Sequence, residues 1–463
     1  MLDSVLIWAD KNRGRWLEDL RQWLAIPSVS AQEPHDADVA AAAEWAMLNL
    51  RGIGLTAELI ATPRHPCVFA TTPPDLCPPH APHILFYGHY DVQPAQAEDG
   101  WHTPPFKPTV KNGDLIARGA SDDKGQVHAH LAALLAWREI ASELPVRLTV
   151  LLEGEEEIGS LHLQKVIEQR SDQLKSAQSL IISDCNQFAP GVPAITCGLR
   201  GLVYYQMDVQ GPAADLHSGL FGGAVANPAN ALVDMLARLH DSQGRVTLPG
   251  FYDDVLNVHD AQRQEWRNLP FSDDQFAREA GITTPFGEAG YTTLERKWIR
   301  PTLDINGLSS GYQGPGAKTV LPAKASAKLS MRLVPNQNPQ KIAAALEAFI
   351  HQITPPGVAV TLTAMGASPA ALTPTDSPAM QAAAEALKIG FGHNPVFVRE
   401  GGSIPVVGWF KQMLNLDAVM VGFGLPDDHI HGPNEKLNLD CYYAGIRTAA
   451  ALYGLLGKKL RTA

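Results

Sequence analysis

The hydrophobic and polar positions divide the chain into stretches with different periodicity. In the N-terminal stretch three segments have apolar residues at helical spacing: 2–25, 36–50 and 123–137. Three short stretches are mainly apolar: 83–88, 145–152 and 177–182. Helical spacing indicates amphipathic helices, and short apolar runs indicate buried strands. Strands that alternate with helices predict an α/β fold with a mostly parallel sheet flanked by helices.

The pattern changes after Gly198. Two segments then alternate between apolar and polar residues, and two others have helical spacing: 202–210 and 323–333, and 227–240 and 339–353. Alternation is typical of half-exposed antiparallel strands. The first pattern resumes near residue 376, with a helix to 388 and strands at 393–398 and 418–421. We therefore expect a discontinuous α/β domain formed by 1–199 and 374–463, with an inserted α+β domain at 200–373.

Charge and composition narrow the classes of partner. The 463 residues carry a net charge of -11, whereas nucleic acids and anionic membranes attract basic surfaces. We expect neither as a partner. No uncharged apolar run reaches the roughly 20 residues that cross a bilayer, and the first residues lack the pattern of a signal peptide. The five cysteines show no C-x-x-C spacing, which favours reduced thiols in a cytoplasmic protein.

Imidazole and carboxylate side chains follow the predicted buried strands. His89 and Asp91 follow the first strand, Glu156 and Glu157 the second, and Asp184 the third. Ligands bind at the carboxyl ends of strands in open α/β sheets, so these side chains are expected to converge. Imidazoles and carboxylates together suit a pair of divalent metal ions. The sequence therefore predicts a two-metal hydrolase.

Each cluster also has a simpler interpretation. His89 could be a solvated loop residue, and Asp122 with Asp123 could cap the helix that begins there. The glutamates at 155–157 could form a solvated acidic face. However, they adjoin a strand too apolar for the surface, and adjacent like charges raise one another's pKa unless a cation is present. Taken together, the clusters favour the metal interpretation.

Two further histidines are candidates for the site. His431, in the segment H-G-P-N-E, lies in a loop after the predicted strand at 418–421 and would supply a second imidazole. The nearby His429 is the competing residue, and we favour His431 because of the segment that follows it. His217 lies in a glycine-rich turn of the inserted domain, where an ordinary turn histidine is an equal alternative.

Several segments resemble one group of enzymes. They are G-H-Y-D-V-Q-P (88–94), R-G-A-S-D-D-K-G (118–125), E-G-E-E-E-I-G-S (153–160), G-L-R-G (198–201), D-L-H-S-G (215–219), G-A-K-T-V-L-P (316–322), R-L-V-P-N (332–336), R-E-G-G-S-I-P (399–405) and H-G-P-N-E-K (431–436). In this order, over about 80–440, the chain resembles the dinuclear metallopeptidases. That family includes acetylornithine deacetylase, succinyl-diaminopimelate desuccinylase, glutamate carboxypeptidase and the carnosine-type dipeptidases, and the dipeptidase branch is the most similar.

The resemblance implies a set of metal ligands. His89 and Asp184 would hold one ion, and Glu157 and His431 would hold the other. Asp122 would bridge both ions. Zinc is the favoured metal, although manganese or cobalt also suits this mixture of imidazole and carboxylate ligands.

The resemblance also implies catalytic roles. Asp91 would orient His89, and Glu156 would be the general base that takes a proton from a water bridging the two metals. His217 would reach across a homodimer into the partner's site, where it would bind substrate and polarise the scissile carbonyl.

Three more positions match residues that hold substrate in the dipeptidases: Thr319, Arg332 and Ser403. A guanidinium binds a carboxylate through two parallel hydrogen bonds, so Arg332 would select substrates with a free C-terminus. The alternative for Arg332 is an exposed cation at a strand end.

The implied protein is a cytoplasmic, homodimeric dipeptidase whose inserted domain serves as a lid and dimerisation domain. One alternative is a deacylase or desuccinylase that uses the same site on N-acyl amino acids. A non-catalytic relative is a second alternative, but it would have lost Glu156 or a ligand, and all are present. Cys185 and the pair Gly432-Pro433 depart from the carnosine-type pattern, which speaks against carnosine itself as substrate.

Overall fold

The computed structural model describes residues 1–402 and 404–460, which form two compact units. Unit 1 contains Met1–Cys197, Thr373–Val398 and the chain from Trp409 onward. Unit 2 contains Gly198–Leu372 and the short segment Arg399–Gly408. The assignment of a catalytic role to one part and of a lid and dimerisation role to the other stays a prediction.

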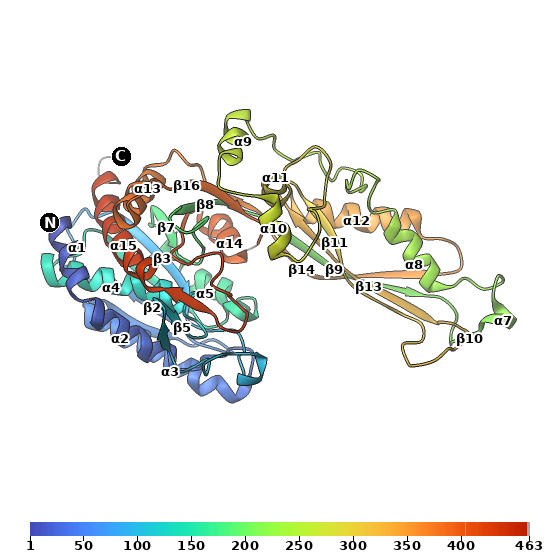
Figure 1. The fold of residues 1–463 in the computed structure, drawn as a ribbon, viewed down its shortest axis with the longest axis horizontal. Coiled ribbons are helices and arrows are strands. Elements are labelled where there is room, and N and C mark those ends of the chain that lie inside the picture. The colour runs from blue at the N-terminus through green and yellow to red at the C-terminus, as the bar shows by residue number, and fades with distance from the viewer. Residues whose placement is uncertain (403, 461–463) are drawn as a thin grey trace. The chain divides into compact units, whose positions relative to one another are not determined.

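The largest sheet is mixed and has nine strands (Figure 1). In spatial order they are β1 (Thr56–Ile60), β2 (Cys67–Thr71), β6 (Arg147–Glu153), β3 (His83–His89), β7 (Ser179–Ile182), β17 (Ala418–Val421), β8 (Ala194–Leu199) and β15 (Ala371–Leu372), with β16 (Val396–Glu400) beside β8. The four central strands, β6, β3, β7 and β17, are parallel. β1 and β2 are joined by a short loop and therefore pair antiparallel. The predicted α/β class is confirmed.

Helices cover the sheet of unit 1. The longer ones are α1 (Leu2–Lys11), α2 (Arg13–Leu24), α3 (Asp36–Ile53), α4 (Lys124–Ala141), α13 (Pro378–Phe391), α14 (Pro405–Leu414) and α15 (Leu439–Lys459). The single helix expected over 2–25 is wrong, because it is interrupted at Asn12. That residue leaves helical geometry at φ -104° and ψ 15°, and its side-chain amide donates to the carbonyl of Trp8.

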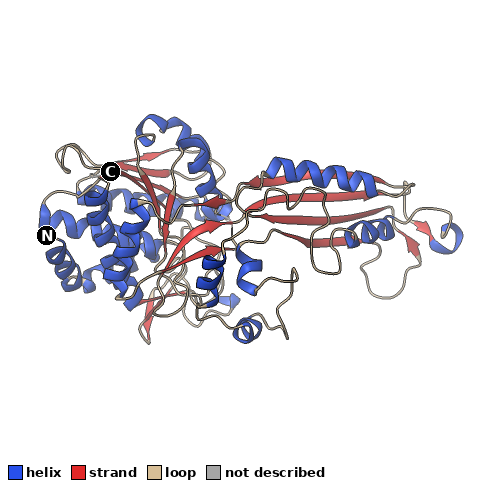
Figure 2. Ribbon diagram, turned by 90° about the horizontal axis from the view of Figure 1, so that it is seen from above, coloured by secondary structure: helices blue, strands red, loops and turns tan. Residues whose placement is uncertain are grey.

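Strand β3 is buried on both faces. Phe86 stacks on His130 of α4 with ring centroids 4.2 Å apart, while Tyr87 meets Phe410 of α14 at 5.7 Å. Because successive residues point to opposite faces of a sheet, these contacts belong to two helical layers. Figure 2 shows helices on both sides of the strands in this part of the chain. Burial on both faces explains why the residues at 84–87 are all apolar or aromatic.

Shorter elements complete unit 1. They are β4 (Thr109–Lys111), β5 (Asp114–Ile116) and β18 (Lys436–Asn438), which form a small sheet, the helices α5 (Leu163–Gln169) and α6 (Ser171–Leu174), and the 3-10 turns η1 (Glu33–His35), η2 (Ala97–Asp99) and η3 (Glu156–Ile158).

Unit 2 is built on an antiparallel sheet. Its strand order is β11 (Thr302–Ser310), β13 (Lys324–Leu333), β9 (Gly201–Gln210) and β14 (Ala359–Ser368). Alternate residues of β9 and β13 form a core with α8 (Pro228–Ala237) and α12 (Pro339–Ile353), as the alternating pattern predicts. The remaining elements are β10 (Leu216–His217), β12 (Val320–Leu321), α7 (Ser218–Phe221), α9 (Asp260–Arg267), α10 (Asp273–Glu279) and α11 (Thr293–Trp298).

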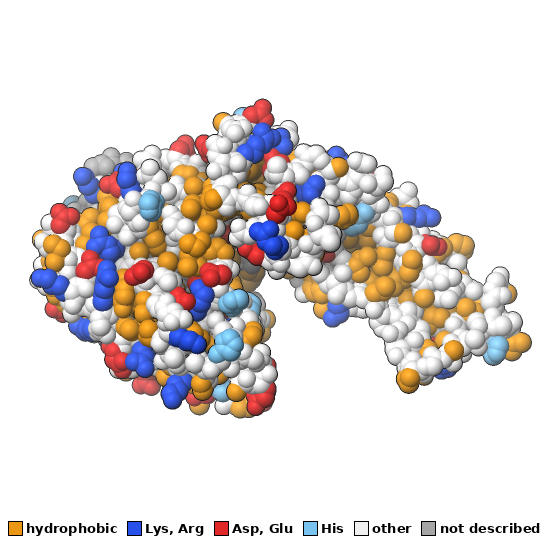
Figure 3. All heavy atoms as spheres, viewed as in Figure 1, with side chains coloured by type: hydrophobic (Ala, Val, Ile, Leu, Met, Phe, Trp, Pro, Cys, Tyr) orange, Lys and Arg blue, Asp and Glu red, His pale blue; other side chains and the backbone are white. Residues whose placement is uncertain are grey.

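The described surface carries charges of both signs. In the view of Figure 3, acidic and basic side chains are interspersed on unit 1, with hydrophobic atoms between them. Among residues 1–402 and 404–460, no helix is both long enough and apolar enough to cross a bilayer. The five cysteines are free thiols.

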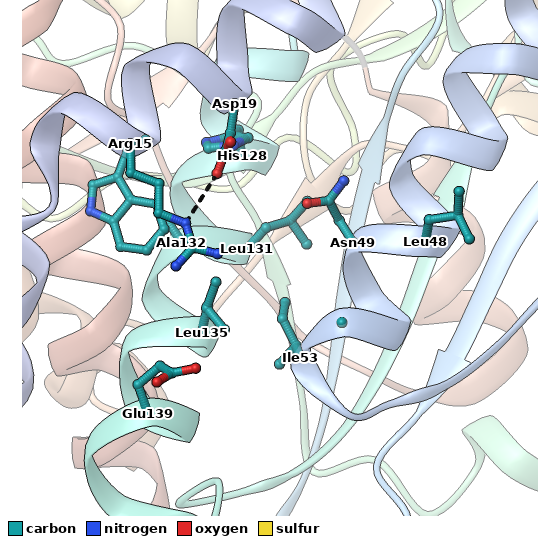
Figure 4. Close-up of a pocket in the computed structure, with 12 residues that line it drawn as sticks. Arg15, Asp19, Leu48, Asn49, Ile53, His128, Leu131, Ala132, Leu135 and Glu139 are labelled. Atoms are coloured by element: carbon teal, nitrogen blue, oxygen red, sulfur yellow. Dashed lines mark ion pairs between the residues drawn. The ribbon is translucent and has the colours of Figure 1, made fainter.

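A cavity of about 290 Å³ lies between α2, α3 and α4. Figure 4 shows the ion pair between Arg15 and Asp19 at its wall, with 3.6 Å between the charged atoms. His128 also lines the cavity, and its Nδ1 lies 2.7 Å from the hydroxyl of Tyr442. None of these residues belongs to a group of three possible metal ligands within the described chain. The cavity is therefore separate from the site described next.

Candidate metal centre

Two groups of three side chains in unit 1 could each hold a metal ion. The first contains His89, Asp122 and Asp184, and the second contains Asp122, Glu157 and His431. Within each group, one ligand atom of every residue lies within 4.8 Å of the others. Atoms that bind one ion at about 2 Å must cluster in this way. The structure thus brings together all five side chains predicted as ligands, with Asp122 in both groups.

The two carboxylate oxygens of Asp122 face different imidazoles. Its Oδ1 lies 3.0 Å from Nε2 of His89, and its Oδ2 lies 2.9 Å from Nε2 of His431. Nε2 of His89 is also 3.9 Å from Oδ2 of Asp184. On the other side, Nε2 of His431 is 3.2 Å from Oε2 of Glu157. Asp122 therefore occupies the position of a carboxylate that two metal ions could share.

The parallel strands place these groups at one edge of the sheet. His89 is the last residue of β3 and pairs with Glu153, the last residue of β6. Asp184 follows β7, and Glu157 lies in the 3-10 turn η3 after β6. His431 lies beyond β17 in a loop where its φ is 62°. The carboxyl ends of neighbouring parallel strands meet at the same edge, which is why distant segments converge here.

Asp91 contacts both His89 and the turn that bears Glu156. Nδ1 of His89 lies 3.1 Å from the backbone oxygen of Asp91 and 3.4 Å from its Oδ1. The Asp91 carboxylate also accepts the backbone N–H groups of Glu156 and Glu157, at 3.2 and 3.0 Å. The predicted role of Asp91 toward His89 stays a prediction. Its hydrogen bonds to the turn were not anticipated from the sequence.

Three neighbours of the predicted ligands were not predicted from the sequence. Gln93 donates from Nε2 to Oε2 of Glu157 at 2.7 Å, and its position four residues after His89 in an extended segment could have indicated this. Asp123 stands at the N-terminal cap of α4 but makes no capping hydrogen bond. Instead, its Oδ2 accepts the backbone N–H of His89 at 3.3 Å. The third is Glu435, a buried carboxylate that binds the loop before Asp122.

The charges of the site suit cations. Burial raises the pKa of Asp184 to about 7, and the Asp122 carboxylate adds to this shift. Desolvation likewise raises the pKa of Glu156. Burial opposes ionisation of Asp122, but hydrogen bonds with His431 and His89 hold its pKa below the usual range. Asp122 and Glu157 raise the pKa of His431 to about 10. Adjacent carboxylates with perturbed pKa values are the donors that divalent ions would neutralise.

The predicted substrate residues lie in unit 2. His217 is exposed on β10, and its Nδ1 accepts the N–H of Gly219 at 3.0 Å. Its neighbour Ser218 donates its N–H to the carbonyl of Thr319 at 3.1 Å, so His217 and Thr319 lie together. Arg332 stands near the far end of β13, where it pairs with Thr302. Ser403 lies outside the described residues.

The competing histidine is not part of either group. His429 is exposed and does not belong to the two clusters found among the described residues. Its backbone carbonyl instead accepts the N–H of Gly432, in the same loop, at 2.8 Å. The geometry therefore favours His431 as the second imidazole.

Comparison with known proteins gives a consistent result. The profile described as peptidase family M20/M25/M40 matches residues 85–454, a range that contains every residue of both groups. The chain is 34% identical to a Cys-Gly metallodipeptidase of Candida albicans, covering 96% of this chain and 95% of that one. It is 31% identical to a Beta-Ala-His dipeptidase of Mus musculus, covering 99% and 96%. A solved metallo-carboxypeptidase of Sulfolobus solfataricus has a TM-score of 0.84 and 32% identity, covering 96% of this chain and 99% of that chain.

Proposed function

The chain belongs to peptidase family M20/M25/M40 and is a metallopeptidase, and from this premise we propose that it hydrolyses dipeptides with two metal ions. The observation that carries the proposal is the Asp122 carboxylate, whose two oxygens face His89 and His431 at 3.0 and 2.9 Å. Two relatives named as dipeptidases, which align with nearly the whole chain, support the substrate class.

The ligand assignment follows the two groups. His89 and Asp184 would hold one ion, Glu157 and His431 the other, and Asp122 both. When bound, such ions polarise a carbonyl and lower the pKa of water. Imidazole and carboxylate donors suit zinc, manganese or cobalt, and we propose zinc. Asp91 and Gln93 would hold His89 and Glu157 in place through the contacts described above.

Glu156 is the proposed general base. Its carboxylate belongs to neither ligand group, although its backbone N–H is fixed by Asp91. The carboxylate is therefore available for proton transfer. One of its oxygens would accept a proton from the attacking water and then return that proton to the leaving amine. Desolvation raises the pKa of Glu156, which makes its carboxylate a stronger proton acceptor and so supports this role.

The separation of Thr319 from Arg332 along unit 2 supports an active site that two subunits share. Thr319 precedes β13 and Arg332 stands near its end, and β13 spans Lys324–Leu333. Ten residues of strand extend about 30 Å, which is much longer than a dipeptide. We propose that the protein is a homodimer in which His217 and Thr319 act in one active site while Arg332, with Ser403, acts in the other. A cytoplasmic location is also proposed, on the cysteine spacing alone.

A substrate panel tests the proposed function. Metal-reconstituted enzyme is expected to cleave dipeptides with a free amino terminus faster than N-acetyl or N-succinyl amino acids. The panel should include Cys-Gly and carnosine, because relatives are named for these two substrates. Initial rates at equal substrate concentration give the ranking. A preference for acyl amino acids would contradict the dipeptidase proposal and favour a deacylase that uses the same metal centre.

Amidation of the substrate tests Arg332. Converting the C-terminal carboxylate to an amide should lower kcat/KM by about 10–100-fold, because a charge-assisted hydrogen-bond pair is lost. The control is the Arg332→Met variant, which should cleave the free acid and the amide at similar, low rates. If the variant still discriminates against the amide, another residue recognises the carboxylate.

A further inference from the structure

Glu435 is a fully buried carboxylate in which each oxygen accepts two hydrogen bonds. Its Oε1 accepts the backbone N–H groups of Ser121 and Asp122, at 2.9 and 3.0 Å. Its Oε2 accepts the N–H of Gly119 at 2.9 Å and Nη1 of Arg118 at 2.7 Å. The side chain thereby holds the backbone of the loop that ends at the bridging ligand.

Arg118 extends this link to the loop that bears His431. From Nη2 the buried guanidinium donates to the carbonyl of Gly432 at 3.2 Å and to that of Pro94 at 3.5 Å. The backbone carbonyl of Glu435 also accepts the N–H of Ala117 at 3.1 Å. A continuous set of hydrogen bonds therefore joins the segment of Asp122 to the segment of Glu435, although these two residues are 313 positions apart in the chain.

For folding alone, this arrangement has a disadvantage. Glu435 places a second buried carboxylate beside Asp122, and of its four hydrogen-bond donors only Arg118 carries a charge. An apolar residue of similar size would avoid the desolvation of a charge. The arrangement is explained if the position of Asp122 relative to His431 has to be fixed.

We propose that Glu435 is a positioning residue that sets Asp122 against His431 and so forms the second metal group. The inference rests on the proposed metal centre. His431 precedes Glu435 by four residues in the same loop, while Asp122 donates its N–H to Glu435 directly. Loss of this link should weaken the group Asp122, Glu157 and His431 more than the group that contains His89 and Asp184.

Glutamine cannot replace this glutamate. An amide offers one oxygen and one N–H₂ group, whereas both oxygens of Glu435 face donors. In either orientation, the amide nitrogen of a Glu435→Gln variant would face two donors and lose both hydrogen bonds. The substitution therefore removes the link with little change in size.

The test is a titration of metal-free protein with Mn²⁺, followed by calorimetry. Wild type is expected to bind two ions per subunit. The Glu435→Gln variant should bind the first ion normally and the second about 10–100-fold more weakly, the usual cost of losing a partner that supports a metal ligand. Its activity should recover at high Mn²⁺ concentration. Glu288→Gln is the matched control, because Glu288 is a buried carboxylate paired with Arg300 in unit 2, at 2.7 and 2.8 Å.

If Glu435→Gln does not fold, Arg118→Lys provides the same test, since lysine keeps the charge but lacks the second arm that reaches Gly432. Equal affinity for the second ion in wild type and in the folded variant would overturn the inference while leaving the metal centre intact. A second ion weakened equally in Glu288→Gln would overturn it as well, because the effect would then be one of general stability. A wild-type protein that binds fewer than two ions would overturn the proposed metal centre itself.

Discussion

Replacing Glu156 with glutamine is expected to lower kcat by about 10²–10⁴-fold, the usual contribution of a general base. This corresponds to about 3–5 kcal/mol of activation free energy. The carboxylate interacts electrostatically with His89, Asp184 and Asp122 but belongs to neither ligand group, so the variant should retain its metal ions. Desolvation raises the pKa of Glu156, so the neutral amide should not lower the melting temperature.

Steady-state kinetics and metal analysis check this prediction together. The matched control is Glu155→Gln, the neighbouring residue in the same acidic run. The side chain of Glu155 is directed to Thr62, the backbone of His65 and Nδ1 of His162, and an amide can keep all three contacts. The control should therefore turn over at nearly the wild-type rate. Near-normal kcat in Glu156→Gln would remove this residue as the base.

The second large effect is expected from His217→Ala, which should lower kcat by about 10²–10³-fold, as loss of a donor to a developing oxyanion does. The imidazole is exposed, and its Nδ1 accepts the N–H of Gly219. Metal content and melting temperature should therefore change little. His259→Ala is the control, since His259 is also an exposed histidine of unit 2. Equal activity of the two variants would leave His217 as a turn residue.

Mixing variants tests whether two subunits share each site. In a heterodimer of His217→Ala and Glu156→Gln, one site would carry both defects and the other would carry neither. If subunits exchange freely in an isologous dimer, an equal mixture should regain about a quarter of wild-type activity. Activity should appear only after subunit exchange. Failure to regain activity in a verified heterodimer would contradict the shared site.

The sequence alone determined the local elements and indicated which residues make up the candidate site. The period of apolar residues depends on neighbours two to four positions away, and it predicted β3, β6, β7 and α4 closely. The proposed ligands could also be predicted, because His89, Glu157 and Asp184 follow buried strands, where burying a charged side chain without a partner is unfavourable. Parallel strands that end at one edge make their convergence a consequence of the fold class.

Only the tertiary structure decided which groups support those ligands. Glu435 lies 313 residues from Asp122 in the chain, and although it belongs to the segment H-G-P-N-E-K, its spacing does not show that its carboxylate binds the loop before Asp122. The same is true of the hydrogen bonds from the Glu156 turn to Asp91. The break at Asn12 was also hidden, because helical spacing continues across it. The period of apolar residues shows which face of a helix or strand is buried. A hydrogen bond between distant segments depends instead on how the loops pack. For this reason the residues of the candidate site could be predicted from the sequence, whereas the contacts of Glu435 and of the Glu156 turn could not.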